Sequence, residues 1–154
     1  MKKLIFILIF SIIAWPVFSQ QGVSKPMTGA QVLNEKYCSS LFAIPDGEYF
    51  DLLDGQSNNV AISYLNILDW LQGRVAGLQV FTTYGQVRIP VIRNRLATVY
   101  VDEMRVSYDY LNSLPVADIA MVKIIKGPFV GNPGAAAGAI AIYTIQGDEE
   151  VQDE

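Results

Sequence analysis

The sequence predicts an α+β domain in which a small mixed β-sheet is flanked by short helices. One stretch repeats apolar residues at the helical spacing i, i+3, i+4 and i+7, and several short later stretches alternate apolar and polar residues as strands do. No internal repeat and no long linker divides the 154 residues, a length typical of one domain with one core. Helices mixed with short strands in a chain of this size are typical of the α+β class.

Residues 1–19 have the pattern of an export signal. Lys2 and Lys3 give a positive start, an apolar run follows, and Val17 and Ser19 fit the positions that a signal peptidase recognises. The apolar run is shorter than the ~20 residues that cross a bilayer as a helix. We therefore predict a cleaved signal peptide and an exported mature protein, and the length of the run argues against the alternative, an uncleaved membrane anchor.

Residues 20–62 are predicted to form a flexible leader followed by a helix. Thr28 and Gln31 have the spacing of a capping box, in which side chains satisfy free backbone groups at a helix start. We therefore expect a helix over about 29–40. The following stretch, up to residue 59, shows no clear periodicity.

The strongest helical pattern begins at Ser63. Ser63 can cap the amino end of a helix, and Gly73 can adopt the left-handed conformation that ends one. Between them, four bulky or apolar residues share one helix face: Tyr64, Ile67, Leu68 and Leu71. A helix from Ser63 to about Gln72 is therefore expected to place that face in the core.

The remaining elements are predicted to be short strands and one more helix. Ser107 or Asp109 can cap that helix, and Pro115 ends it. Pro90 predicts that its strand lies at an edge or contains a bulge. A loop rich in glycine and alanine, 127–138, is expected to let two chain segments approach closely. The strands are predicted at 78–82, 87–91, 98–101, 104–106, 120–125 and 139–145, and the apolar strand 120–125 is expected to be central.

Charge limits the partners of the mature protein. The whole sequence carries 11 basic and 15 acidic residues, for a net charge of −4, and loss of the signal peptide removes two lysines. Five acids lie in residues 148–154, which we predict to be a solvated acidic tail. This balance argues against nucleic acid or an anionic membrane surface as the partner.

The inventory of side chains argues against catalysis. The sequence contains no histidine and one cysteine, Cys38, so a Ser–His or Cys–His nucleophile pair and a zinc site built from Cys and His are excluded. Cys38 is expected to be a buried apolar residue within the first helix. Asp102 and Glu103 lie at a predicted turn, where acids commonly bond the backbone. We therefore predict a protein that is not an enzyme and uses no cofactor or metal.

Four stretches, taken in order, resemble the plug domain of TonB-dependent outer-membrane receptors, especially the SusC-like group of Bacteroidetes. In that family the corresponding motifs are L-x-G-R-x-x-G-x-x-V, a strand ending in I-R-G, V-x-V-D-G, and D-I-x-x-I-E-V-L-K-G followed by a glycine-rich loop and a strand. The matching stretches here are LDWLQGRVAGLQV (68–80), VRIPVIRN (87–94), TVYVDEMRV (98–106) and VADIAMVKIIKGPFVGNPGAAAGAIAIYTIQG (116–147). The resemblance implies a plug-like domain over residues 63–147.

The sequence also departs from the family pattern. Asn94 and Glu103 replace motif glycines, Asn132 and Pro133 replace the usual small and aromatic residues, and residues 20–27 hold no visible TonB box. In the family a large barrel follows the plug in the same chain, whereas this sequence stops soon after the plug motifs. TonB-driven nutrient uptake is therefore not expected, and a free-standing plug protein without its own barrel is.

The resemblance implies a steric function. The main hypothesis is a non-enzymatic plug that docks in trans, from the periplasmic side, on a large outer-membrane barrel and closes its channel, as in a protein-secretion translocon such as the type 9 system. The alternatives are a periplasmic ligand- or protein-binding module built on a plug scaffold and a receptor fragment without a role. Polar or irregular segments at element ends supply the candidate partner-binding residues: Arg74, Arg93, Arg95, Asn132 and Pro133. For the arginines, surface solvation or salt bridges are the alternative.

Overall fold

The computed structural model describes residues 28–54, 60–128 and 138–145. The predicted signal peptide, the acidic tail, and Asn132 with Pro133 lie outside these ranges. Within them, no helix is both long enough and apolar enough to cross a membrane.

The main sheet has five strands and mixed direction, as predicted. Its strand order is β1-β7-β8-β5-β6, with β5 parallel to β8 and the other neighbours antiparallel. The parallel pair requires a long connection, which here runs from β5 through β6, helix α5 and β7 before β8. The strands are β1 (Glu48–Asp51), β5 (Thr98–Val101), β6 (Met104–Arg105), β7 (Ile119–Ile125) and β8 (Ala139–Thr144).

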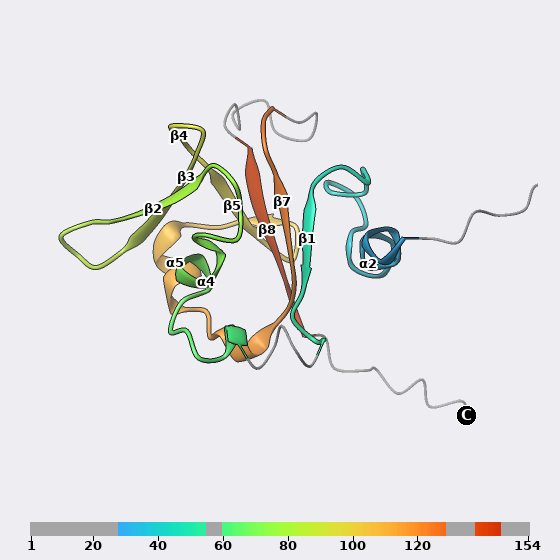
Figure 1. Ribbon diagram of the computed structural model, residues 1–154, viewed down its shortest axis with the longest axis horizontal. Helices are drawn as coiled ribbons and strands as arrows, with labels where there is room; N and C mark the ends of the chain where they lie inside the picture. Colours follow the sequence, from blue (N-terminus) through green and yellow to red (C-terminus); the bar gives the residue numbers. More distant parts are fainter. Residues whose placement is uncertain (1–27, 55–59, 129–137, 146–154) are drawn as a thin grey trace, which may run out of the picture.

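A second, antiparallel sheet projects to one side of the main sheet (Figure 1). It has the order β2-β3-β4 and consists of β2 (Leu78–Thr82), β3 (Arg88–Ile92) and β4 (Arg95–Leu96). Figure 1 shows the helices on opposite sides of the main sheet, α2 beyond β1 and both α4 and α5 on the side of the second sheet. The helices are α2 (Gly29–Tyr37), α4 (Ile67–Leu71) and α5 (Tyr108–Ser113), with a 3₁₀ turn at Val116–Asp118.

The two faces of the main sheet bury two separate clusters, because alternate strand residues point to opposite faces. The larger cluster joins β5, β7 and β8 to α4 and α5, and includes Ile67, Leu71, Leu111, Val122 and Ile142. The smaller cluster lies on the α2 side and includes Cys38, Phe42, Met121, Ala141 and Tyr143. Every residue of β7 is buried, and β7 lies between β1 and β8, so it is an interior strand as predicted.

The helix predicted from Ser63 begins later, at Ile67. Asn66 is its cap, since its side-chain oxygen accepts a hydrogen bond from the Leu68 backbone N–H at 2.8 Å. The Ser63 hydroxyl instead donates to the Val60 carbonyl at 2.7 Å and belongs to a preceding turn. Gly73 follows α4 with φ of +89°, so its predicted left-handed conformation is confirmed.

Two further local predictions are corrected. The first helix ends at Tyr37, and Cys38 is buried just beyond it in extended conformation rather than inside the helix. Strand β1 was not predicted at all, although it pairs with β7 along its whole length. The close approach expected of the glycine-rich loop is confirmed at its end, because a Cβ on Gly138 would lie 2.1 Å from the Ile125 carbonyl oxygen.

Pro90 lies in the middle strand of the second sheet, neither at an edge nor in a bulge. Its carbonyl accepts from the Ala97 N–H at 3.0 Å, but the reciprocal donor is missing because proline has no N–H. The Tyr108 hydroxyl donates to the Ala97 carbonyl at 2.9 Å and so replaces that donor. A tyrosine from α5 therefore allows a proline at a position that normally excludes it.

Lys123 fixes the segment after α2 on the main sheet. Its side chain is fully buried on β7, and its ammonium group donates to Asn34 Oδ1 at 2.7 Å and to the Phe42 and Ile44 carbonyls at 2.6 and 2.5 Å. The Tyr49 ring lies 4.9 Å from the same nitrogen. Burial lowers the pKa of Lys123. The four groups replace the water that would otherwise solvate the ammonium group.

Glu103 makes the second attachment of this segment. Its carboxylate accepts hydrogen bonds of 2.7 to 3.3 Å from the backbone amides of Ser39, Ser40 and Leu41 and from both serine hydroxyls. Burial alone would raise the pKa of Glu103, but these hydrogen bonds outweigh it and lower the pKa to about 2. The predicted role of this turn acid in backbone bonding is thereby confirmed.

We predict that Lys123→Met lowers the free energy of unfolding by about 3 kcal/mol, because it leaves the buried Phe42 carbonyl and the partly buried Ile44 carbonyl without a donor. Urea denaturation of the purified protein measures this. Lys126→Met is the control, since Lys126 pairs mainly with the partly exposed Glu48 and should cost less than about 1 kcal/mol. Equal losses in the two variants would contradict the role assigned to Lys123.

We also predict that Glu103→Gln flattens the acid limb of the stability curve. A carboxyl whose folded pKa is about 2, below its ordinary value, contributes stability that is present above pH ~4.5 and is lost as pH falls towards 2. Thermal melting between pH 5 and 2.5 measures the difference from the unmodified protein. Glu35→Gln, on an exposed position of α2, is the matched control. The prediction fails if both variants follow the same curve.

Candidate docking surface

The second sheet has one buried face and one exposed face. Leu78, Pro90 and Ile92 are buried against the core. On the other face, Phe81 pairs with Ile89 and Leu96 with Val91, and the side chains of Phe81 and Leu96 are 55% and 62% exposed. Tyr84, in the loop between β2 and β3, is fully exposed. The outer face is therefore an apolar surface open to solvent over the described residues.

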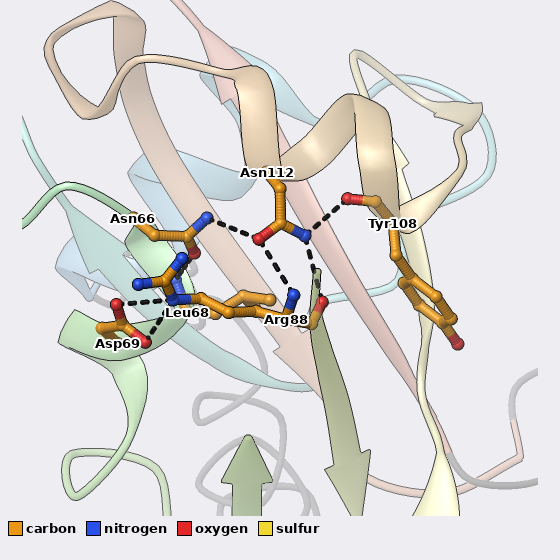
Figure 2. Close-up of polar contacts among 6 residues, drawn as sticks. All are labelled: Asn66, Leu68, Asp69, Arg88, Tyr108 and Asn112. Carbon is orange, nitrogen blue, oxygen red and sulfur yellow. Dashed lines mark hydrogen bonds and ion pairs between the residues drawn. The ribbon is translucent and has the colours of Figure 1, made fainter. Parts of the chain in front are cut away.

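A polar network holds the base of this sheet to the helices (Figure 2). Asn112, on α5, accepts from the Arg88 backbone N–H at 3.0 Å and donates to the Arg88 carbonyl at 3.1 Å. Its amide thus satisfies Arg88 as a neighbouring strand would. It also donates to the Tyr108 carbonyl and accepts from the Asn66 side chain at 3.1 Å. One side chain therefore joins α5, β3 and the cap of α4.

The Arg88 side chain adds a second tie to α4. Its Nε donates to Asp69 at 2.7 to 2.8 Å, and Figure 2 shows this pair beside the Asn66 cap. Both side chains are about one-third exposed, at 29% and 34%. A pair this accessible contributes on the order of 0.2–1 kcal/mol, so its main effect is to orient the hairpin rather than to stabilise it.

Arg93 and Arg95 flank the short turn between β3 and β4. Arg93 and Asn94 both have left-handed backbone, with φ of 49° and 63°, which matches a tight hairpin turn. Asparagine tolerates this conformation, so Asn94 can stand where the family motif has glycine. The Arg93 N–H donates to the Gly77 carbonyl at 3.1 Å, and both arginine side chains are exposed.

Arg74 has a different environment from the other two. Its guanidinium lies 4.6 Å from the Trp70 ring centroid and 5.8 Å from that of Tyr64, and one of its nitrogens donates to the Trp70 carbonyl at 2.7 Å. The hydrogen bond satisfies a carbonyl at the end of α4, and the two rings hold the guanidinium by cation–π contacts. Arg74 therefore packs on its own helix, whereas the side chains of Arg93 and Arg95 make no hydrogen bond or ion pair with any described residue.

Sequence reasoning missed the apolar half of this surface. Phe81, Tyr84 and Leu96 were not among the candidate residues, although alternation along β2 placed Phe81 opposite the residues expected in the core. That signal could have identified the surface. Asn132 and Pro133 lie outside the described residues, so their predicted role stays a prediction.

The rest of the described structure offers a less well-defined candidate site. An open cavity of about 460 Å³ lies between β5, β6 and the start of α5 and is lined by residues such as Thr98, Arg105 and Asp109. No group of three or more metal-binding side chains is found within the described ranges.

Comparison with known structures identifies the fold. The structure of the RagAB peptide importer in its open-open state is similar with a TM-score of 0.52 and 23% identity, over 65% of this chain and 12% of that one. A mutant of the ferric enterobactin receptor PfeA from Pseudomonas aeruginosa is similar with a TM-score of 0.51 and 18% identity, over 78% of this chain and 19% of that one. No family model and no curated protein matches the sequence.

The fold is therefore plug-like, as the four motifs predicted. The chain spans less than a fifth of the length of the chains it matches. The two matched proteins are a peptide importer and a ferric enterobactin receptor, and at 23% and 18% identity the likeness shows the fold alone.

We predict that Asn112→Ala lowers the free energy of unfolding by about 2–3 kcal/mol, since it removes the partner of the Arg88 backbone and of the Asn66 side chain together. Chemical denaturation measures the loss. Ser113→Ala is the matched control on the same helix. Its hydroxyl makes one exposed hydrogen bond to the Tyr110 carbonyl, so a change below about 0.5 kcal/mol is expected. A loss confined to the control range would contradict the network.

Proposed function

We propose that this protein is a non-enzymatic plug that docks in trans on the periplasmic side of a large outer-membrane β-barrel and closes its channel. A wide protein-secretion channel, such as the translocon of the type 9 system, is the kind of barrel that requires such closure. The protein would reside in the periplasm and associate with the outer membrane through this partner alone.

The observation that supports the proposal is the plug-like fold. The similarity covers most of the described chain but only 12–19% of the outer-membrane proteins concerned, so it is confined to one part of each. Closing a channel needs a compact domain with complementary surface and no chemistry. The described residues supply that domain, with a doubly covered sheet at its centre.

Arg93 and Arg95 are the proposed polar contacts with the barrel. They are exposed, they lie on a tight turn that holds them in place, and no described residue neutralises them. Arginine is favoured at interfaces because its planar guanidinium binds carboxylates with two parallel hydrogen bonds. Arg74 is a weaker candidate, since its guanidinium already stacks on Trp70.

The test is purification of the tagged protein from detergent-solubilised outer membrane. We expect a barrel protein to co-purify and its conductance in a planar bilayer to fall when the plug is added. The proposal is wrong if no barrel co-purifies. A monomeric periplasmic pool without a membrane-bound fraction would favour the alternative, a binding module on a plug scaffold.

We predict that the double variant Arg93→Gln, Arg95→Gln reduces recovery of the barrel about tenfold, because it removes two charges from the docking surface. Arg105→Gln is the matched control, since Arg105 is also exposed but lies on β6 of the main sheet. Circular dichroism of each variant shows whether the fold is retained. Equal recovery with both variants would contradict the assignment of these two arginines.

A further inference from the structure

Strand β2 is an open edge of the second sheet. In an antiparallel pair, the backbone N–H and C=O groups of successive residues alternately point towards the partner strand and away from it. The Thr83 N–H donates to the Val87 carbonyl at 3.0 Å, so the backbone groups of Thr83 point to β3. Those of Thr82 therefore point away from β3, to the outer edge of the sheet. Arg88, opposite Thr82, confirms this, because both of its backbone groups bond Asn112 rather than Thr82.

The backbone groups of Val80, two residues before Thr82, also point to the outer edge. Its partner in the register is Pro90, which has no N–H and whose carbonyl accepts from Ala97 on the other side. The backbone N–H and C=O groups of Val80 and Thr82 therefore all point to the outer edge of β2. No backbone hydrogen bond joins them to another described segment.

Within the part of the chain that the structure describes, this edge shows none of the usual sequence protections against pairing. Natural edge strands are commonly blocked by a lysine, a proline, a bulge or a very short length. β2 has five residues, LQVFT, with no charge and no proline, and its register with β3 has no irregularity. Phe81, between Val80 and Thr82, is 55% exposed, so an apolar side chain is available for contact next to the free backbone groups.

The charge beside the edge is positive. Residues 70–101 contain four arginines and no acid, in a sequence whose net charge is −4. Arg88 is already paired with Asp69, Arg74 stacks on Trp70, and Arg95 lies on β4 at the opposite edge of the sheet. Arg93 is therefore the unpaired arginine near β2. The Arg93 side chain lies against Gly77, directly before β2, with its Cγ 3.9 Å from the position that a Cβ on Gly77 would occupy.

We propose that the free edge of β2 binds an extended segment of a partner protein, which adds a strand to the second sheet, covers Phe81 with apolar side chains and places a carboxylate beside Arg93. Backbone hydrogen bonds to Val80 and Thr82 supply the affinity, and the apolar and acidic contacts supply the specificity. A second copy of β2 fits less well, because the sequence LQVFT brings no carboxylate to Arg93. The two proposals share Arg93, but the edge pairing does not require that the partner be a barrel.

The experiment is a titration of the ¹⁵N-labelled mature protein, residues 20–154, followed by NMR. The probe is a short peptide of alternating valine and threonine with glutamates at both ends, and its counterpart carries lysines there. We expect the glutamate peptide to bind at least tenfold more tightly, to shift the Val80 and Thr82 amide signals most, and to slow their hydrogen exchange.

Two matched variants separate edge pairing from side-chain effects. Thr82→Pro removes one outward N–H and leaves the bonds to β3 in place, since Thr82 does not face that strand. Thr82→Ala keeps the N–H. We expect the proline variant to lose at least tenfold in affinity and the alanine variant less than twofold, with unchanged circular dichroism in both.

Several results would overturn the proposal. Absence of binding by both peptides, or equal loss in the two Thr82 variants, would exclude edge pairing. Equal affinity for the glutamate and lysine peptides would exclude the acidic partner. Slow exchange of the Val80 and Thr82 amides in the free protein would show that another part of the chain or a second copy already covers the edge. Co-purification of a barrel tests the other proposal separately, because it does not depend on these outcomes.

Discussion

The buried ammonium group of Lys123 is the constraint on which the first half of the fold depends. Met121 and Ile125, its neighbours on the same face of β7, are buried in apolar surroundings, so a charge between them would be unfavourable by several kcal/mol without partners. Its partners come from Asn34 and from the carbonyls of Phe42 and Ile44, which are far from it in sequence. The buried Lys123 thus ties the segment between α2 and β1 to this face at three points.

The turn between β5 and β6 completes that attachment. Asp102 and Glu103 both have left-handed backbone, with φ of 46° and 64°, which costs roughly 1–2 kcal/mol per residue without a glycine. The Asp102 carboxylate accepts from the backbone N–H and hydroxyl of Thr144, and Glu103 binds the chain after α2. Hydrogen bonds to a charged group contribute about 1.5–3 kcal/mol each, so the bonds outweigh the strain. This explains how Glu103 can occupy a motif glycine position.

Sequence patterns predicted the elements that alternation or motifs define, and they missed what tertiary contacts decide. The predicted strands 78–82 and 98–101 both match the structure, and the first was recognised by the alternation of its apolar residues. β1 was missed because its four residues, EYFD, are all half-buried and show no alternation. Ser63 and Asn66 are equally good caps, and Asn66 prevails where its amide also reaches Asn112, 46 residues away. A contact between residues so far apart in the sequence leaves no local pattern, so the polar network that positions the second sheet could not be predicted.

The edges of the two sheets show why β2 differs from the rest of the molecule. β6 and β4 have only two residues each, too few to template another strand. β1 is longer, but it begins and ends with an acid, Glu48 and Asp51, and these charges oppose the approach of another edge. β2 alone among these four edges is both uncharged and of full length. Within the described residues three edges carry a protection and β2 carries none, so β2 is the edge best suited to pair with another strand.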